Sequence, residues 1–321
     1  MNNDISKYLV SVILPVYNGE KYIKEAVDSI LKQSHKFFEL IIINDGSSDK
    51  TLDIINSIKD KRIVIFNLDH KGLIEALNFG ISKAKGNYIA RMDSDDISSP
   101  KRIEKQLKTL LVRKADICGC SFYTINSESF IKRSYLAPFT KDEIFLKLAI
   151  NVPFCHGSVL AKKDIFLKYK YGSIGANLIE DYCLWLKMYQ EGVEFINADE
   201  KLYFLRLHSE SLSNRQTSIF NLVSTEFSLR FISNNIKRLS SIINSINIRK
   251  HIFRRISSSD SDYFFLSLIL LKYRIMKINF KNLFILFILI LRKNIYNLFC
   301  FFEISMNHIY RKSIKNVTMK N

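Results

Sequence analysis

The first 220 residues alternate between two hydrophobic patterns. Short, nearly continuous apolar runs, typical of strands buried on both faces of a parallel sheet, alternate with stretches in which apolar residues recur at helical spacing. The apolar runs predict strands at Leu9–Val16, Glu39–Asn44, Arg62–Leu68, Tyr88–Met92 and Asp116–Ile125. The helical spacing predicts helices at Ile23–Leu31, Thr51–Ile58 and Leu73–Ala84, and another after Pro100. This alternation indicates an α/β fold with a mostly parallel central sheet.

Two residues predict where elements end. Pro15 has no N–H to donate to a strand ladder, so the first strand should end there. Gly86 follows the third helix and should close it in a left-handed conformation.

Polar loops follow three of the predicted strands. They run from Tyr17 to Glu20, from Asp45 to Ser48 and from Asp93 to Asp96. Each loop alone could be a simple turn, but the carboxyl ends of parallel strands meet at one edge of a sheet, where ligands bind. The sequence has neither the glycine-rich dinucleotide motif nor a P-loop, so we predict a different kind of site shared by the three loops.

The third of these loops concentrates negative charge. Asp93, Asp95 and Asp96 place three carboxylates within four residues at the end of a strand. Hard cations such as Mg²⁺ or Mn²⁺ bind such oxygens, and Mg²⁺ usually fills its remaining positions with water and phosphate. One interpretation is a metal held against a nucleotide diphosphate. The other is an acidic turn that leads into the helix after Ser99 and Pro100.

Three segments carry a resemblance to a known family. Val12–Glu20, Ile42–Asp49 and Ala90–Asp96 resemble, in order, the signatures of family 2 glycosyltransferases with the GT-A fold. The resemblance extends from Val10 to Ser213. It implies a GT-A-like three-layer sandwich over residues 1–220 and an inverting transfer of a sugar from a nucleotide-sugar to an acceptor hydroxyl, with Mn²⁺ or Mg²⁺ as cofactor.

The resemblance also implies roles for individual residues. On the donor side, the residues expected to hold base, ribose and nucleotide are Pro15, Tyr17, Glu20, Asp45, Arg91 and Asp93. The residue matching Asp45 accepts a hydrogen bond from the base, typically uracil, which indicates a UDP-sugar donor. Asp93 and Asp95 are expected to reach the metal on the diphosphate.

The second half of the matched region contains candidate residues for the acceptor side and further candidates for the donor side. Asp181 matches the catalytic base of the family, although an acidic pair at a helix N-terminus can also be purely structural. Arg206 is suited to a diphosphate by its bidentate fork, and His208 could reach the metal or phosphate. His156 lies in a segment that lines the floor of the site in relatives, and we interpret it as a structural histidine. Trp185 could pack beside an acceptor sugar or in the core.

Charge and hydropathy change towards the C-terminus. The chain has 321 residues and a net charge of +17; residues 231–321 hold 16 Lys and Arg against three acidic residues. The apolar runs Tyr263–Leu271 and Leu283–Leu291 are shorter than a membrane-spanning helix requires. We predict that residues 221–321 form a helical extension that lies on an anionic membrane surface. A helical bundle or an oligomer interface is the alternative, and the high apolar content argues against nucleic-acid binding.

Together these features predict a glycosyltransferase of bacterial surface polysaccharide synthesis at the cytoplasmic face of the membrane, acting on a glycan or lipid-linked acceptor. Five cysteines without metal-ligand spacing fit a reducing compartment, and no signal peptide is expected. Two alternatives stay open: a sugar-phosphate nucleotidyltransferase, and an inactive nucleotide-sugar-binding scaffold protein at the membrane.

Overall fold

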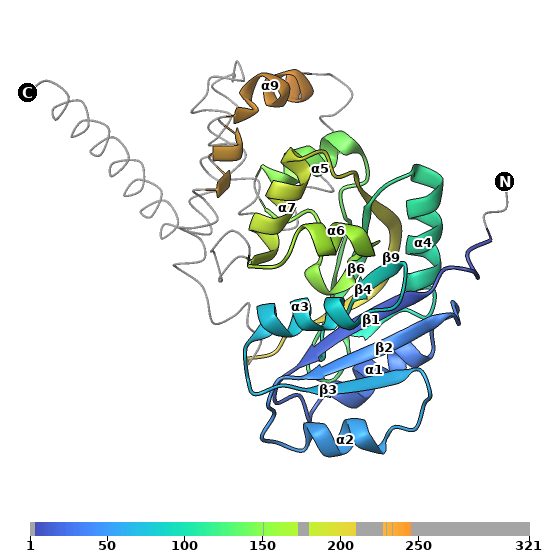
Figure 1. The fold of residues 1–321 in the computed structure, drawn as a ribbon. Coiled ribbons are helices and arrows are strands. Elements are labelled where there is room, and N and C mark those ends of the chain that lie inside the picture. The colour runs from blue at the N-terminus through green and yellow to red at the C-terminus, as the bar shows by residue number, and fades with distance from the viewer. Residues whose placement is uncertain are drawn as a thin grey trace, which may run out of the picture. The chain divides into compact units, whose positions relative to one another are not determined.

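The computed structural model describes residues 4–149, 151–172, 180–209, 227–228, 230–232 and 234–244 (Figure 1). Its strands are β1 Val10–Val16, β2 Phe38–Asn44, β3 Ile63–Asn67, β4 Tyr88–Arg91, β5 Ile97–Ser98, β6 Ile117–Ile125, β7 Ile131–Tyr135, β8 Leu160–Lys162 and β9 Phe195–Arg206. Its helices are α1 Ile23–Leu31, α2 Thr51–Ser57, α3 Leu73–Lys83, α4 Arg102–Arg113, α5 Lys141–Leu148, the 3-10 turn η1 His156–Ser158, α6 Lys163–Lys168, α7 Glu180–Gln190 and α9 Ile236–Asn244. The predicted apolar runs of the C-terminal extension lie outside the described residues.

The described strands form one sheet in the order β3-β2-β1-β4-β8-β6-β9-β5, with β7 paired to β6. The β3-β2-β1-β4 half is parallel, as is the β6–β9 pair, whereas β8 and β5 run antiparallel to their neighbours. The predicted α/β fold with a mostly parallel sheet is therefore confirmed.

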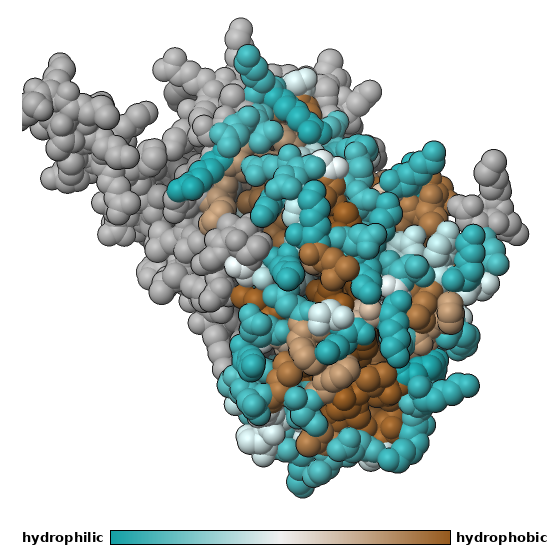
Figure 2. All heavy atoms as spheres, viewed as in Figure 1, coloured by the Kyte–Doolittle hydropathy of each residue, from teal (hydrophilic) through white to brown (hydrophobic). Residues whose placement is uncertain are grey.

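Helices cover both faces of the sheet (Figure 1). On one face, buried residues of β1 and β2 such as Leu14 and Ile42 share a core with Ile23 of α1 and Leu107 of α4. On the other face, α3 packs closely through Gly80. Apolar residues also gather over β2 and β3 on the face shown in Figure 2, where the edge strand β3 is half-buried.

The first strand does not end at Pro15, contrary to the prediction. Pro15 pairs with Ile43, and β1 continues through Val16. Ladder pairing between β1 and β4 stops at Ile13 and Arg91, so the missing N–H of Pro15 falls where β1 no longer needs a donor on that side.

Gly86 is also not the left-handed cap that we predicted. Helix α3 ends at Lys83, and Ala84 is already extended. Glycine is required at position 86 for a different reason, because a Cβ there would lie 2.6 Å from the carbonyl oxygen of Leu9 and 2.7 Å from the backbone nitrogen of Ser11. The close approach of two backbones fixes this residue.

Residues beyond the predicted boundary at 220 contact the α/β body. Phe231 packs against Phe145 of α5, with ring centroids 5.4 Å apart. Arg238 of α9 lies over the same ring and 3.9 Å from Asp142. In the described part of the chain, no helix combines the length and apolar character needed to cross a bilayer.

Replacing Gly86 by Ala should destabilise the fold more than replacing Gly80 by Ala. At Gly86 the new methyl group meets backbone atoms of Leu9 and Ser11, whereas at Gly80 it meets isoleucine side-chain carbons, and the helix gains intrinsic propensity. We expect Gly86→Ala to lower the free energy of unfolding by about 2–3 kcal/mol and Gly80→Ala by less, measured by urea denaturation. Equal losses in both variants would contradict the close backbone approach.

Candidate active site

Hydrogen bonds join the loops after β1 and β2 to each other at the carboxyl edge of the sheet. The backbone N–H of Asn18 donates to Ser47 Oγ (2.9 Å), and Asn18 Oδ1 accepts from the N–H of Ser48 (2.8 Å). Glu20 Oε2 accepts from the backbone N–H of Lys50 (2.9 Å). Glu20, predicted to help hold base and ribose, therefore also fixes the loop that would surround them.

The residues predicted to hold the base lie around a histidine. Asp45 is buried, and its two oxygens accept the backbone N–H groups of Lys71 (2.7 Å) and Gly72 (2.8 Å). The ring of Tyr17, which is 49% exposed, stacks on His70 at a centroid distance of 3.9 Å. His70 Nδ1 lies 3.1 Å from the carbonyl oxygen of Asp45. Because each carboxylate oxygen keeps further lone pairs, Asp45 retains the capacity to accept from a ligand.

Sequence reasoning missed His70, although a signal was present. His70 lies in the loop after β3, which ends at the same edge as the three loops that we selected. The rule that selected those loops applies equally to it. Pro15, in contrast, is buried within β1.

Arg91 and Asp93 form an ion pair where β4 ends. Arg91 Nη1 donates to Asp93 Oδ2, and the arginine side chain is only 4% exposed. Burial opposes the charge of Arg91, but the attraction of Asp93 outweighs it and raises the pKa of Arg91 above its usual value. Gly157 of η1 lies so close that a Cβ there would collide with Asp93 Oδ2 and with the hydroxyl of Tyr203. The segment around His156 thus borders the acidic loop directly.

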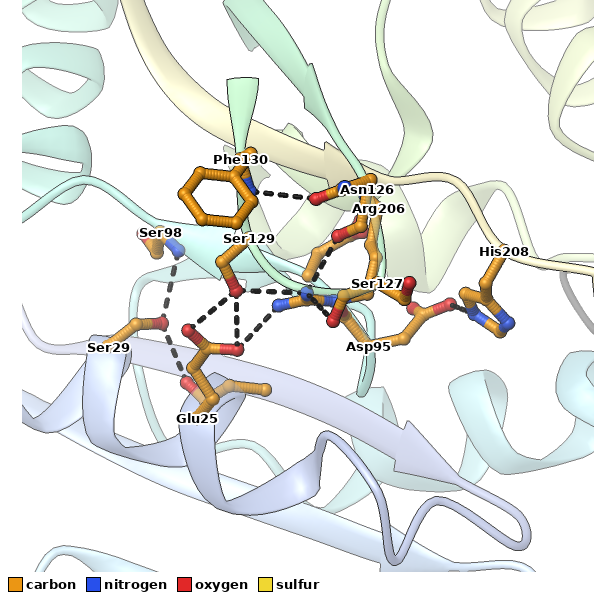
Figure 3. Close-up of polar contacts among 12 residues, drawn as sticks. Glu25, Ser29, Asp95, Ser98, Asn126, Ser127, Ser129, Phe130, Arg206 and His208 are labelled. Atoms are coloured by element: carbon orange, nitrogen blue, oxygen red, sulfur yellow. Dashed lines mark hydrogen bonds and ion pairs between the residues drawn. The ribbon is translucent and has the colours of Figure 1, made fainter. Parts of the chain in front are cut away.

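The predicted metal ligands Asp95 and His208 meet in the structure. His208 Nε2 lies 2.8 Å from Asp95 Oδ2 (Figure 3). Burial, and then repulsion from Asp93, raises the pKa of Asp95. Asp96 is buried and accepts the backbone N–H of Arg206 at 2.7 Å. Asp96 therefore holds the loop in place, whereas the side chains of Asp95 and His208 contact each other.

The donor set fits a metal that is completed by a ligand. No group of three or more His, Cys, Asp or Glu side chains within the described residues is arranged to hold a metal ion. One carboxylate with one imidazole, beside a second carboxylate held by an arginine, is nevertheless a set of hard donors. Such a site needs oxygens from phosphate and water to complete its coordination.

Arg206 does not face an open site. Its side chain is 0% exposed. The guanidinium donates to five protein groups: the backbone oxygens of Asp95 (2.6 Å), Asn126 (3.0 Å) and Ser127 (3.2 Å), Ser129 Oγ (3.0 Å) and Glu25 Oε2 (2.5 Å). Figure 3 shows this anchor between α1, the β6–β7 turn and the acidic loop. The geometry gives no support to the predicted diphosphate contact and makes Arg206 a residue that positions Asp95.

Asp181 lies in the first turn of α7, with its side chain 18% exposed. Its Oδ1 accepts the backbone N–H of Tyr182 (2.7 Å), and its Oδ2 lies 4.0 Å from Nδ1 of His156. Burial raises the pKa of Asp181. Burial and the neighbouring charge of Asp181 raise the pKa of Glu180 to about 7. A carboxylate with a raised pKa is a stronger base than one in water.

The acceptor-side and donor-side residues share one electrostatic environment. Besides burial, Arg91 lowers and Asp93 raises the pKa of Asp181. The end of β4 and the start of α7 lie near each other, because Gly157 borders Asp93 and the adjacent His156 lies 4.0 Å from Asp181. Trp185 of α7 resolves an alternative left open by the sequence: it is fully buried and packs edge-on against Phe154 at 5.5 Å, so it belongs to the core.

Comparison with known proteins identifies the class of this site. Residues 11–169 match the family described as Glycosyl transferase family 2. The O-antigen biosynthesis glycosyltransferase WbnJ of Escherichia coli is 34% identical over 229 residues, which cover 69% of this chain and 88% of that protein. The chain therefore belongs to the family 2 glycosyltransferases, and it is a transferase enzyme.

Solved structures share the fold. TarS 1–349 of S. aureus in complex with UDP-GlcNAc superposes with a TM-score of 0.57 at 18% identity and covers 81% of this chain and 79% of its own. The mannosyltransferase PcManGT of Pyrobaculum calidifontis, in complex with GDP-Man and Mn²⁺, gives a TM-score of 0.51 at 15% identity over 83% and 88% of the two chains. The GT-A type of fold that we predicted is confirmed.

Replacing Arg206 by Lys tests the anchor directly. A lysine has three donors on a single nitrogen and cannot span the five acceptors that the guanidinium reaches, so we expect the free energy of unfolding to fall by about 2–3 kcal/mol without any nucleotide present. The control is Arg62→Lys, at a half-buried ion pair with Asp60, for which we expect a smaller loss of about 1 kcal/mol. Unchanged stability with weakened nucleotide binding would instead support the diphosphate role.

Glu180→Gln should change the pH dependence of stability. The folded pKa of about 7 lies above the usual 4.5, so the folded state binds the extra proton between these values. The wild type therefore loses stability as pH rises through 7, and the glutamine variant does not. We expect the difference in free energy of unfolding, variant minus wild type, to grow by on the order of 1–3 kcal/mol from pH 4.5 to 8. A difference that is constant across this range would show that Glu180 is not buried as described.

Proposed function

We propose that the protein transfers a sugar with inversion from a nucleotide-sugar to an acceptor hydroxyl, with Asp181 as the general base. The observation that carries this proposal is the position of Asp181. It is a half-buried carboxylate with a raised pKa, at a helix N-terminus, within electrostatic reach of the Arg91–Asp93 pair at the edge where the loops converge. A base on the acceptor side and an acidic, metal-binding loop on the donor side are the two parts that a single displacement needs.

In the proposed reaction, one bond forms and one bond breaks at the anomeric carbon of the donor sugar. The acceptor hydroxyl oxygen forms a bond to the anomeric carbon of the donor, and its proton passes to Asp181. The bond between the anomeric carbon and the diphosphate breaks, and its electron pair leaves with the nucleoside diphosphate. Attack and departure on opposite sides of the carbon invert its configuration.

The donor side is formed by residues that bind and orient the nucleotide. Tyr17, Asp45 and His70 surround the proposed base pocket, and Arg91 holds Asp93 in place at the end of β4. Asp95 and His208, with Asp93, would hold Mn²⁺ or Mg²⁺, which supplies positive charge that stabilises the leaving diphosphate. The solved structure of the similar protein TarS 1–349 is a complex with UDP-GlcNAc, and this supports a UDP-linked donor for the present chain.

The acceptor is proposed to be a hydroxyl of a glycan or of a lipid-linked sugar in surface polysaccharide synthesis. The support is the name of the relative WbnJ, an O-antigen glycosyltransferase, and the basic, apolar composition of residues 221–321. That composition suits a peripheral position on the inner face of the membrane.

The test measures nucleoside diphosphate release from a panel that includes UDP-GlcNAc and GDP-mannose, with Mn²⁺, with Mg²⁺ or with EDTA. For wild type we expect metal-dependent turnover of one donor. Asp181→Asn should lower turnover at least about 100-fold while the donor still binds, and Asp95→Asn should weaken metal-dependent binding. Asp164→Asn, in the exposed first turn of α6, is the matched control and should leave turnover unchanged.

Two outcomes would contradict the proposal. Turnover by Asp181→Asn within about twofold of wild type would remove Asp181 as the base. Donor binding by wild type without turnover, even with added glycan acceptors, would favour the nucleotide-sugar-binding scaffold.

A further inference from the structure

His156 is packed into a polar network that ends at Asp181. Its Nε2 lies 3.0 Å from the hydroxyl of Tyr171, and its Nδ1 lies 4.0 Å from Asp181 Oδ2. The imidazole also packs edge-on to Trp185, with centroids 6.1 Å apart. Both ring nitrogens thus face a polar group, which packing alone would not require.

Tyr171 is itself held in place from a distant helix. Asn78 of α3 accepts the backbone N–H of Tyr171 and donates to its carbonyl oxygen, both at 3.1 Å. The tyrosine ring is 3% exposed and stacks on Phe166. The hydroxyl therefore has a fixed position relative to the imidazole.

The imidazole carries one proton in this environment. Burial, and then the charge of Arg91, lowers the pKa of His156 well below its usual value. A neutral imidazole has one N–H, and the partner of one ring nitrogen decides which nitrogen holds it. If the Tyr171 hydroxyl donates to Nε2, the N–H is on Nδ1 and points towards Asp181.

We propose that His156 is a positioning residue that orients Asp181 and stabilises its carboxylate form through Nδ1–H, in the tautomer set by the hydroxyl of Tyr171. This inference rests on the proposed role of Asp181 as the base. The present distance of 4.0 Å exceeds a hydrogen bond, and catalytic hydrogen bonds of this kind often shorten when substrate is bound.

Other charged and titratable groups also face Asp181. They are Glu180 and Cys183 on α7 itself, Arg91 and Asp93 from the end of β4, and Tyr171 beside His156. Of these, only Arg91 is a cation, and it is already paired with Asp93. Among the residues that the structure describes, His156 thus offers a neutral imidazole whose Nδ1 lies 4.0 Å from Oδ2 of Asp181.

The first test reads the tautomer without any activity. In the full-length protein labelled with ¹⁵N-histidine, the signal of His156 is assigned by its loss in His156→Asn, among six histidines. We expect the Nδ1–H tautomer in the wild type and a loss of that preference in Tyr171→Phe. An Nε2–H tautomer in the wild type would overturn the proposal.

The second test follows turnover of the donor found in the panel against pH. His156→Phe should move the acid limb of the pH profile of kcat to higher pH by about 1 unit, because the Asp181 carboxylate loses its donor and its pKa rises. His156→Asn places an amide N–H near the position of Nδ1 and should move the limb less. His35→Asn removes a buried histidine bonded to the backbone oxygens of Tyr8 and Phe37, and should lower stability without moving the limb.

The outcomes separate this inference from the proposed function. If His156→Phe only lowers the melting temperature, or lowers kcat equally at every pH, His156 is a packing residue and the inference fails. If Asp181→Asn keeps its activity, the role of Asp181 as base fails, whereas the tautomer measurement still decides the contact with Tyr171.

Discussion

The site depends on one constraint: β1 runs parallel to both of its neighbours. Its register sets Ile13 beside Arg91 of β4 and Val16 beside Asn44 of β2. Parallel strands have all their carboxyl ends on one side, so the loops after β1, β2 and β4 emerge together. Had either neighbour been antiparallel, one of those loops would lie at the opposite edge of the sheet. Strand direction alone therefore brings the three loops to one edge. The hydrogen bonds between the first two loops, and the ion pair after β4, then fix the positions of individual side chains.

Buried arginines provide the second level of organisation. Arg91 holds the side chain of Asp93, Arg206 holds the backbone oxygen of Asp95, and Arg102 donates to the carbonyl of Arg91. A short loop with three carboxylates, partly removed from water, is costly because of desolvation and mutual repulsion. Guanidinium groups reduce this cost with charge and supply donors that fix the backbone. The acidic loop is therefore built as a rigid element, although its sequence alone resembles an ordinary turn.

The sequence predicts the elements of this fold well because hydrophobic periodicity is local. Strands β1 to β4 and helices α1 to α3 occur where the patterns place them, within one residue at each end. The roles of Arg206, Gly86 and His70 depend instead on partners distant in the chain. The anchor of Arg206 needs Glu25 and the β6–β7 turn, and Gly86 is fixed by the backbone of Leu9. Nothing within a few positions of these residues encodes those neighbours, so a motif suggests a residue's importance but not its contacts.

The two-residue strand β5 links both halves of the proposed metal site. Ile97 and Ser98, which directly follow Asp95–Asp96, pair with Phe204 and Tyr203, which lie shortly before Arg206 and His208 in the chain. The carboxylate and the imidazole thus flank one short hydrogen-bonded ladder, which ties the two segments that carry them to each other. A cation that binds there has little conformational entropy to remove, because the chain was ordered when it folded. Changes at Ile97 or Phe204, which supply no donor atom, would then alter affinity by restoring freedom to residues that do.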